Sequence, residues 1–265
     1  MAKSGAAARA RALWEFDAEL RRQAGGPIAG VDEAGRGCLA GPVVAAAVIL
    51  PDGAVLEGVD DSKRMTPRGR EQARKAIDAV ALDIGIGIAG PSLIDDLNIL
   101  KATLCAANWC VEDLNPKPRL LITDYLRMDG QDAAVRAEAK ADSKSLSVAA
   151  ASIVAKTERD RLMALYAMEY PFYAFERNKG YGSSEHLEGL RRHGPSTLHR
   201  LSFAGVGFFS DALIRSRTFE RLRAMRAQAG NTEWKQAARQ ALSNMDCPLA
   251  DRETTIVLEW LERRI

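Results

Sequence analysis

Short apolar runs near the start of the chain are bounded by glycine and proline, the residues that most often end a strand. Residues 28–32 and 43–50 are largely apolar, and residues 82–89 alternate isoleucine with aspartate and glycine. Runs of this length and pattern predict three consecutive β-strands. We expect short connections between them to favour antiparallel neighbours.

Helical spacing of apolar residues appears in three later segments. Thr66 is a suitable N-cap and Pro67 fits a first helical turn, so the sequence predicts a helix over residues 67–80. A second helix is predicted over residues 94–114. A third, over residues 146–168, carries apolar residues at helical spacing with charged residues between them, which is typical of a helix packed on a sheet.

Two more strands are predicted among these helices, over residues 119–124 and 135–142, and each ends in an aspartate. Strands come first and then alternate with helices, which indicates an α/β fold with a mixed central sheet flanked by helices. The Ala/Arg-rich residues 1–26 are predicted to be a frayed or weakly helical N-terminal extension, with order beginning near Pro27. Residues 207–265 are helical in composition and are predicted to form a C-terminal helical lobe.

The composition narrows the class of protein. The 265 residues are 47% hydrophobic and 27% charged, which suits a folded protein with a substantial core. No apolar stretch has the length of a membrane-spanning helix, so we expect a soluble protein without a membrane partner. The four cysteines include no CxxC pair, which favours reduced thiols in the cytoplasm.

The charge is unevenly distributed along the chain. The net charge is only +2, but residues 177–226 contain ten Lys or Arg against four Asp or Glu. Such a segment can form a polyanion-binding face. It can equally be a solvated helix surface, and both interpretations stay open.

Carboxylates stand where the predicted strands end. Asp32 and Glu33 close the first strand, and two glycines directly after them would let the chain bend so that both acids face one site. Asp124 and Asp142 end two further strands. Carboxylates gathered at one edge of a sheet would repel one another unless cations lay among them, and Mg²⁺ and Mn²⁺ prefer such oxygen ligands. For any single aspartate, a turn or a helix cap is the alternative.

The chain closely resembles the ribonuclease HII family, the type 2 ribonucleases H, over residues 28–206. The resemblance is carried by four ordered blocks: GVDEAGRGCLAGPVVAAAVI at 30–49, DDSKRMT at 60–66, KADSKSLSVAAASIVAKTERDR at 140–161 and NKGYGSSEHLEGLRRHGPSTLHRLSF at 178–203. It implies an RNase H-like fold, with a catalytic domain over residues 27–206.

The same resemblance implies the site residues. The acids that would be catalytic and would coordinate two divalent ions, Mg²⁺ or Mn²⁺, are Asp32, Glu33, Asp124 and Asp142. The residues that would bind substrate are Gly35, Arg36 and Gly37, which would read the ribose 2′-hydroxyl, Tyr181, which would stack on a sugar, and Lys63, Ser152 and Lys156, which would contact phosphates. An ordinary half-buried aromatic is the alternative for Tyr181.

One departure from the family pattern affects Asp124. It is followed by Tyr125 and Leu126, whereas relatives commonly have glycine close behind this aspartate, and Asp129 is a nearby competitor in a turn-like Asp-Gly context.

The activity implied by the resemblance is that of a monomeric, metal-dependent endoribonuclease. It would hydrolyse the RNA strand of RNA:DNA hybrids and nick duplex DNA on the 5′ side of embedded ribonucleotides, leaving 3′-hydroxyl and 5′-phosphate ends. Two alternatives are weighed. Ribonuclease HIII carries an additional N-terminal domain, for which about 27 residues would be too few. A catalytically dead hybrid-binding protein is disfavoured because all four acidic positions are occupied.

Overall fold

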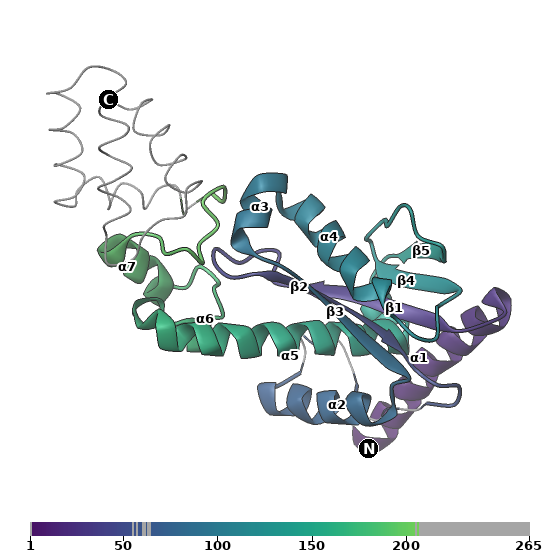
Figure 1. Ribbon diagram of the computed structural model, residues 1–265. Coiled ribbons are helices and arrows are strands. Elements are labelled where there is room, and N and C mark those ends of the chain that lie inside the picture. The colour runs from purple at the N-terminus through teal and green to yellow at the C-terminus, as the bar shows by residue number, and fades with distance from the viewer. Residues whose placement is uncertain are drawn as a thin grey trace, which may run out of the picture. The chain divides into compact units, whose positions relative to one another are not determined.

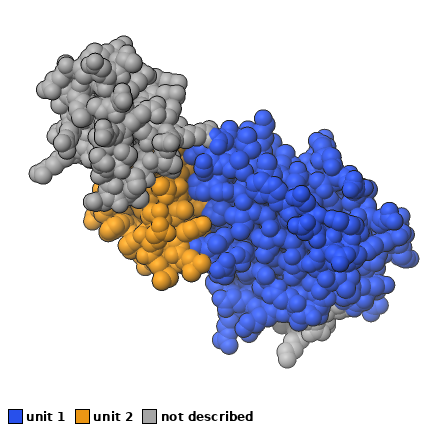
Figure 2. Space-filling view, viewed as in Figure 1, with its two compact units in different colours: residues 1–36, 42–162 blue, residues 37–41, 163–265 orange. Residues whose placement is uncertain are grey.

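The computed structural model describes residues 2–54, 56, 58–59, 62, 65–204 and 206. The chain forms two compact units (Figure 2). The first comprises Met1–Arg36 and Pro42–Leu162, and the second comprises Gly37–Gly41 and the chain from Met163 onward. The predicted C-terminal helical lobe, residues 207–265, lies outside the described residues.

A five-stranded sheet in the order β3-β2-β1-β4-β5 forms the centre of the first unit (Figure 1). Its strands are β1 (Ile28–Ala34), β2 (Val43–Ile49), β3 (Asp83–Ala89), β4 (Leu120–Asp124) and β5 (Ala134–Glu138). The pairs β1–β2 and β2–β3 are antiparallel, whereas β1–β4 and β4–β5 are parallel. The predicted mixed α/β sheet and its antiparallel first three strands are therefore confirmed.

Helices cover both faces of this sheet. The helices of the first unit are α1 (Ala2–Ala24), α2 (Pro67–Val80), α3 (Pro91–Leu97), α4 (Ile99–Glu112), the 3₁₀ turn η1 (Ala141–Ser143) and α5 (Leu146–Glu169), which continues into the second unit. Helix α4 packs on β2 and β3, and α1, α2 and α5 lie on the opposite face (Figure 1). There Leu13, Val48, Ile77 and Ile153 share one buried cluster. The predicted helix over 67–80, with Thr66 as its cap, is confirmed.

The N-terminal segment is an ordered helix, so the prediction of a frayed start with order from Pro27 is wrong. Leu13 and Leu20 of α1 are 3% and 4% exposed and join two different core clusters. The buried carboxylate of Asp17 accepts a 2.8 Å hydrogen bond from the backbone N–H of Ser147, in the first turn of α5. Helix α1 therefore satisfies part of the α5 N-terminus, where backbone donors otherwise lack partners.

Two predicted elements are shorter than expected. The helix over 94–114 is interrupted at Asn98, whose φ of 73° ends α3 and whose side chain caps α4 by accepting from Lys101 N–H. The strand over 135–142 ends at Glu138, and Asp142 lies in η1 instead. Asp142 therefore does not end a strand, because the chain turns at Lys140, whose φ is positive, before reaching it.

The second unit has its own small core. It contains the 3₁₀ turn η2 (Pro171–Tyr173), α6 (Phe175–Asn178) and α7 (Ser184–His193). Ala40, Met163, Tyr173, Phe175 and Leu190 form its buried apolar cluster. Residues 37–41 thus pack with a segment that is far away in the sequence.

Among the described residues, no helix combines the length and the apolar character needed to cross a bilayer.

The capping contact of α1 gives a stability prediction. Replacing Asp17 by alanine leaves the Ser147 N–H buried without its acceptor, so we expect the free energy of unfolding to fall by about 1–3 kcal/mol. Glu15, whose ion pair with Arg11 is exposed, is the matched control, and Glu15→Ala should change stability by less than about 1 kcal/mol. Chemical denaturation measures both. Equal losses in the two variants would contradict the role given to Asp17.

Candidate active site

Two of the predicted acids lie side by side at one edge of the sheet. The parallel strands β1 and β4 pair Val31 with Thr123, so Asp32 and Asp124 are the next residues in register on adjacent strands. Both strands run in the same direction, and their carboxyl ends therefore meet at one edge. Asp32 is only 7% exposed, whereas Asp124, the last residue of β4, is partly exposed.

The third aspartate reaches this edge from the turn after β5. The Asp124 carboxylate accepts a 3.1 Å hydrogen bond from the backbone N–H of Ala141. This contact fixes η1 against the end of β4, and the next residue along the chain is Asp142, which is 6% exposed. The 3₁₀ turn, rather than a strand end, therefore brings the Asp142 backbone to the end of β4.

The pKa of Asp32 is raised to about 8. Burial is the largest cause because it disfavours the charged form, and the neighbouring charge of Glu33 acts in the same direction. A hydrogen bond from Ser152 opposes the shift, and Asp124 adds to it. Asp32, Glu33 and Asp124 are therefore close enough to interact through their charges.

The donor chemistry of this group suits a hard divalent cation. Carboxylate oxygens are the preferred ligands of Mg²⁺ and Mn²⁺, and a cation would offset the repulsion that raises the pKa of Asp32. Within the described residues, no three His, Cys, Asp or Glu side chains converge as a ready-made ion cage. The carboxylates thus fit a divalent cation by their charge and their ligand type, not by preformed coordination geometry.

Ser152 and Lys156 come from successive turns of α5. Ser152 is 4% exposed, shares a 2.8 Å hydrogen bond with the hydroxyl of Ser62, and donates to Asp32. This burial favours support of the Asp32 carboxylate over direct contact with a phosphate. The Lys156 ammonium donates a 2.7 Å hydrogen bond to Asp160. Lys63, the other predicted phosphate contact, lies outside the described residues.

The turn after β1 is built around a buried arginine. Gly35 has a φ of +95°, and a Cβ there would lie 2.0 Å from Nε of Arg159. The same Nε donates a 2.9 Å hydrogen bond to the carbonyl of Pro42, and Arg159 is completely buried. Gly35 is therefore required by the fold itself. Arg36, next along the chain, places its guanidinium 3.2 Å from the Glu33 carboxylate.

Arg159 is the residue that the sequence analysis missed. It continues the buried face of α5, since Val148, Ala151 and Ala155 precede it at helical spacing. Its position on that face is the signal that could have identified it, although its charge suggested a solvated position.

Tyr125 supports the assignment of Asp124 over Asp129. Its φ is +60°, in the left-handed region that glycine adopts readily, and its side chain is 75% exposed. Position 125 therefore has a backbone conformation that glycine favours, although a tyrosine occupies it. Asp129 is exposed, and it is not among the charges that shift the pKa of Asp32.

The two other predicted substrate contacts belong to the second unit. Gly37 is exposed, has no positive φ, and a Cβ there would meet nothing within 4 Å. Tyr181 is 47% exposed. Its neighbour Gly180 has a φ of +83°, and a Cβ there would lie 2.4 Å from the carbonyl oxygen of Ala40. Gly180 is thus fixed by packing inside the protein, whereas nothing among the described residues requires Gly37 to lack a side chain.

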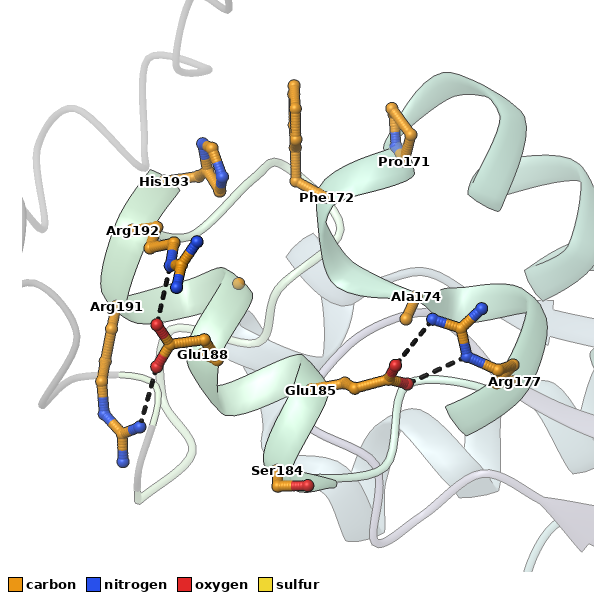
Figure 3. A pocket seen from close by; sticks show the side chains of 11 residues that line it. Pro171, Phe172, Ala174, Arg177, Ser184, Glu185, Glu188, Arg191, Arg192 and His193 are labelled. Carbon is orange, nitrogen blue, oxygen red and sulfur yellow. Dashed lines mark hydrogen bonds and ion pairs between the residues drawn. The ribbon is translucent and has the colours of Figure 1, made fainter.

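A surface pocket of about 570 Å³ lies in the second unit, between α7 and the segment from Pro171 to Arg177 (Figure 3). Its arginines are paired within the pocket: Arg177 binds Glu185, and Arg191 and Arg192 both bind Glu188. The described part of the basic segment therefore carries little unpaired positive charge. Five of its ten basic residues lie in residues 207–226, outside the described residues.

Known proteins match this chain in sequence and in fold. The sequence model of the family described as ribonuclease HII matches residues 29–206. The ribonuclease HII of Geobacter sulfurreducens is 50% identical over 195 residues, covering 74% of this chain and 90% of that protein. The crystal structure of ribonuclease H2 from Pyrococcus horikoshii has a TM-score of 0.62 at 25% identity and covers 72% of this chain and 100% of the other. The crystal structure of Bst-RNase HIII in complex with Mn²⁺ has a TM-score of 0.56 at 20% identity, over 72% and 71% of the chains.

A mixed sheet with carboxylates gathered at the ends of β1 and β4, in an RNase H-like fold, defines the class as metal-dependent nucleases. The chain belongs to the ribonuclease HII family. Members of this family are divalent-metal-dependent endoribonucleases of the ribonuclease H type, which act on RNA:DNA hybrids. The family match also favours ribonuclease HII over the alternative of ribonuclease HIII.

The raised pKa of Asp32 predicts a pH-dependent gain in stability for Asp32→Asn in EDTA. Between pH about 4 and about 8 the folded protein keeps a proton on Asp32 that the unfolded chain releases, so the free energy of unfolding falls as the pH rises. Asparagine removes this penalty. Thermal unfolding should therefore show Asp32→Asn gaining Tm over wild type at pH 8 and little at pH 4. The exposed Asp129→Asn is the control, and a gain independent of pH would contradict the assignment.

Proposed function

We propose that this protein hydrolyses the RNA strand of RNA:DNA hybrids and also nicks duplex DNA on the 5′ side of embedded ribonucleotides, leaving 3′-hydroxyl and 5′-phosphate ends. The observation that carries the proposal is the carboxylate group at the ends of β1 and β4, where burial and the charges of Glu33 and Asp124 raise the pKa of Asp32. We propose residues 27–206 as the catalytic part of the chain.

Asp32, Glu33, Asp124 and Asp142 would hold two divalent ions, Mg²⁺ or Mn²⁺. Such ions, when bound, activate a water and stabilise the leaving oxygen of a phosphodiester. The chain's own contribution is to keep these carboxylates in place. Ser152 donates to Asp32, Ala141 N–H donates to Asp124, and Arg36 pairs with Glu33, so each of these three contacts holds one of the acids.

Recognition of ribose would rest on Gly37 and Tyr181. The 2′-hydroxyl is the group that distinguishes RNA from DNA, and it can both donate and accept a hydrogen bond. Exposed backbone at Gly37, with open space where a Cβ would be, allows close approach by a sugar. The half-exposed ring of Tyr181 is available for stacking on the adjoining sugar.

We also propose that the enzyme acts as a monomer in the cytoplasm. The described cysteines Cys38, Cys105 and Cys110 are free thiols, which suits a reducing compartment.

Cleavage of a labelled duplex containing one ribonucleotide tests the function directly. With Mg²⁺ or Mn²⁺ we expect a single nick on the 5′ side of the ribonucleotide, and none in EDTA. Asp142→Asn should lower the rate by more than about 100-fold because it removes a charged ligand, while Asp129→Asn should cleave as wild type. Binding of the duplex without cleavage by the wild-type protein in either metal would instead support a hybrid-binding protein.

Substitutions at Gly35 and Gly37 distinguish a glycine that the fold requires from a glycine that recognises the ribose. Gly37→Ala should leave Tm unchanged, because its Cβ meets open space, but should reduce cleavage of the single-ribonucleotide duplex about tenfold to hundredfold by holding the sugar away. Gly35→Ala should lower Tm, because a Cβ there collides with Arg159 at a positive φ. Steady-state cleavage and thermal unfolding of both variants measure this. Normal cleavage by folded Gly37→Ala would remove Gly37 from ribose recognition.

A further inference from the structure

Two histidines of the second unit belong to a buried chain of hydrogen bonds that ends on the backbone of Tyr181. His186 and His199 are both 0% exposed, and their Nε2 atoms lie 2.9 Å apart. Nδ1 of His186 lies 2.9 Å from the carbonyl oxygen of Tyr181, and Nδ1 of His199 lies 2.9 Å from the backbone nitrogen of Ser196. Hydrogen bonds therefore connect Ser196, the two imidazoles and Tyr181 without a break.

These contacts fix where each proton lies. A carbonyl oxygen can only accept, so Nδ1 of His186 carries a hydrogen and donates it to Tyr181. The backbone N–H of Ser196 can only donate, so Nδ1 of His199 is without a hydrogen and accepts. The single proton between the two Nε2 atoms then belongs to His199, and the bonds all run in one direction, from Ser196 to Tyr181.

The surroundings keep both rings neutral, as this arrangement requires. Burial lowers the pKa of His186, and burial, together with the repulsion that a protonated His186 would exert, lowers the pKa of His199 to about 3. Aromatic rings hold the imidazoles from the side: Phe175 meets His186 edge-on with centroids 5.2 Å apart, and Tyr173 meets His199 at 4.7 Å. Protonation of either ring would place two N–H groups against each other and break the link.

The loop that carries Tyr181 is held from its other side by residues 39–41. The carbonyl of Gly180 accepts hydrogen bonds from the N–H groups of Leu39 and Ala40, at 2.9 and 3.3 Å. Arg200, which follows His199, donates from its backbone to Leu39 and from Nε to the carbonyl of Gly41. The peptide groups on both sides of the Tyr181 Cα are therefore fixed, one by Leu39 and Ala40 and the other by His186 together with the backbone N–H of Ser183, which donates to the Tyr181 carbonyl at 2.8 Å.

We propose that His186 and His199 are positioning residues for Tyr181, which set the direction of its exposed ring toward the sugar of the ribonucleotide through the hydrogen bond to the Tyr181 carbonyl. The inference rests on the proposed stacking role of Tyr181. The side chain of Tyr181 is half exposed, whereas its carbonyl is held by a buried donor. The direction of the ring therefore depends on the backbone hydrogen bonds around it, and the two histidines contribute the one that His186 donates to the Tyr181 carbonyl.

A double-mutant cycle on kcat/KM for the single-ribonucleotide duplex tests this. His186→Phe keeps an aromatic ring beside Phe175 but cannot donate, and it should lower kcat/KM about tenfold. Tyr181→Ala should lower it by about tenfold to hundredfold, because the stacking ring is gone. Adding His186→Phe to Tyr181→Ala should then cause no further loss, because no ring remains to be directed. Losses that multiply in the double variant would overturn the inference.

Two further measurements keep the test independent of a folding defect. His186→Asn retains a donor where Nδ1 lies and should restore most of the activity lost in His186→Phe, whereas no recovery in a folded His186→Asn would count against the proposal. In the wild-type protein, ¹⁵N NMR should find the proton of His186 on Nδ1, and a proton on Nε2 would overturn it. His193→Asn, at an exposed ring stacked on Phe172, is the control and should cleave as wild type.

The outcomes separate this inference from the proposed function. Absence of metal-dependent cleavage by the wild-type protein would refute the function. Cleavage by Tyr181→Ala at the wild-type rate would refute the stacking role, and the positioning role with it. Cleavage that needs Tyr181 but is unchanged in His186→Phe would refute only the positioning role.

Discussion

Parallel pairing of β1 with β4 brings carboxylates together at the carboxyl ends of these two strands. Several contacts of the first unit compensate for the electrostatic cost of placing them there. Val31 lies opposite Thr123, so Asp32 and Asp124 follow in register, and Asp32 is buried. A buried carboxylate near others pays both desolvation and repulsion, which raises the pKa of Asp32. Hydrogen bonds from Ser152 to Asp32 and from Ala141 to Asp124 offset part of this penalty. The remainder is a penalty that a divalent cation bound beside these carboxylates would offset.

Helix α5 connects these groups, and its N-terminus depends on the helix that precedes the sheet. Asp17 of α1 accepts from Ser147, and Gly30 of β1 allows the first turn of α5 to approach so closely that a Cβ would lie 2.1 Å from the Ser147 carbonyl carbon. Ser152 lies farther along α5, beside Asp32. Arg159 follows it on the same helix, and the turn at Gly35 packs against its side chain. A shift of α5 at its N-terminus would therefore move both a carboxylate partner and the turn that follows β1.

In the second unit, buried polar groups hold the loop that carries Tyr181 in place. Its core combines aromatic rings with His186 and His199, and every ring nitrogen of the two histidines has a partner. Buried polar chains of this kind specify one arrangement because each broken bond would leave an unpaired group in an apolar setting. Residues 39–41 are bonded to Gly180 and to Arg200, so the segment that follows Gly37 and the loop that carries Tyr181 share one framework.

The sequence alone determined the order of the central strands, the helix over residues 67–80 with its Thr66 cap and the residues of the four ordered blocks, because these follow from local periodicity, capping chemistry and ordered motifs. It could not show that α1 is part of the core, since a short Ala/Arg-rich stretch is helical only when Leu13 and Leu20 find a surface to pack on. Nor could it place Asp142 in a 3₁₀ turn, find Arg159 behind Gly35, or distinguish the packing glycine Gly180 from the open glycine Gly37. The hydrogen bond between His186 and His199 was equally out of reach, because thirteen positions separate them in sequence and only the folded second unit brings their rings to 2.9 Å. Local interactions depend on residues that are neighbours in the sequence. Burial, the cost of ionising Asp32 and the direction of the hydrogen bonds through the two histidines exist only once distant segments are in contact.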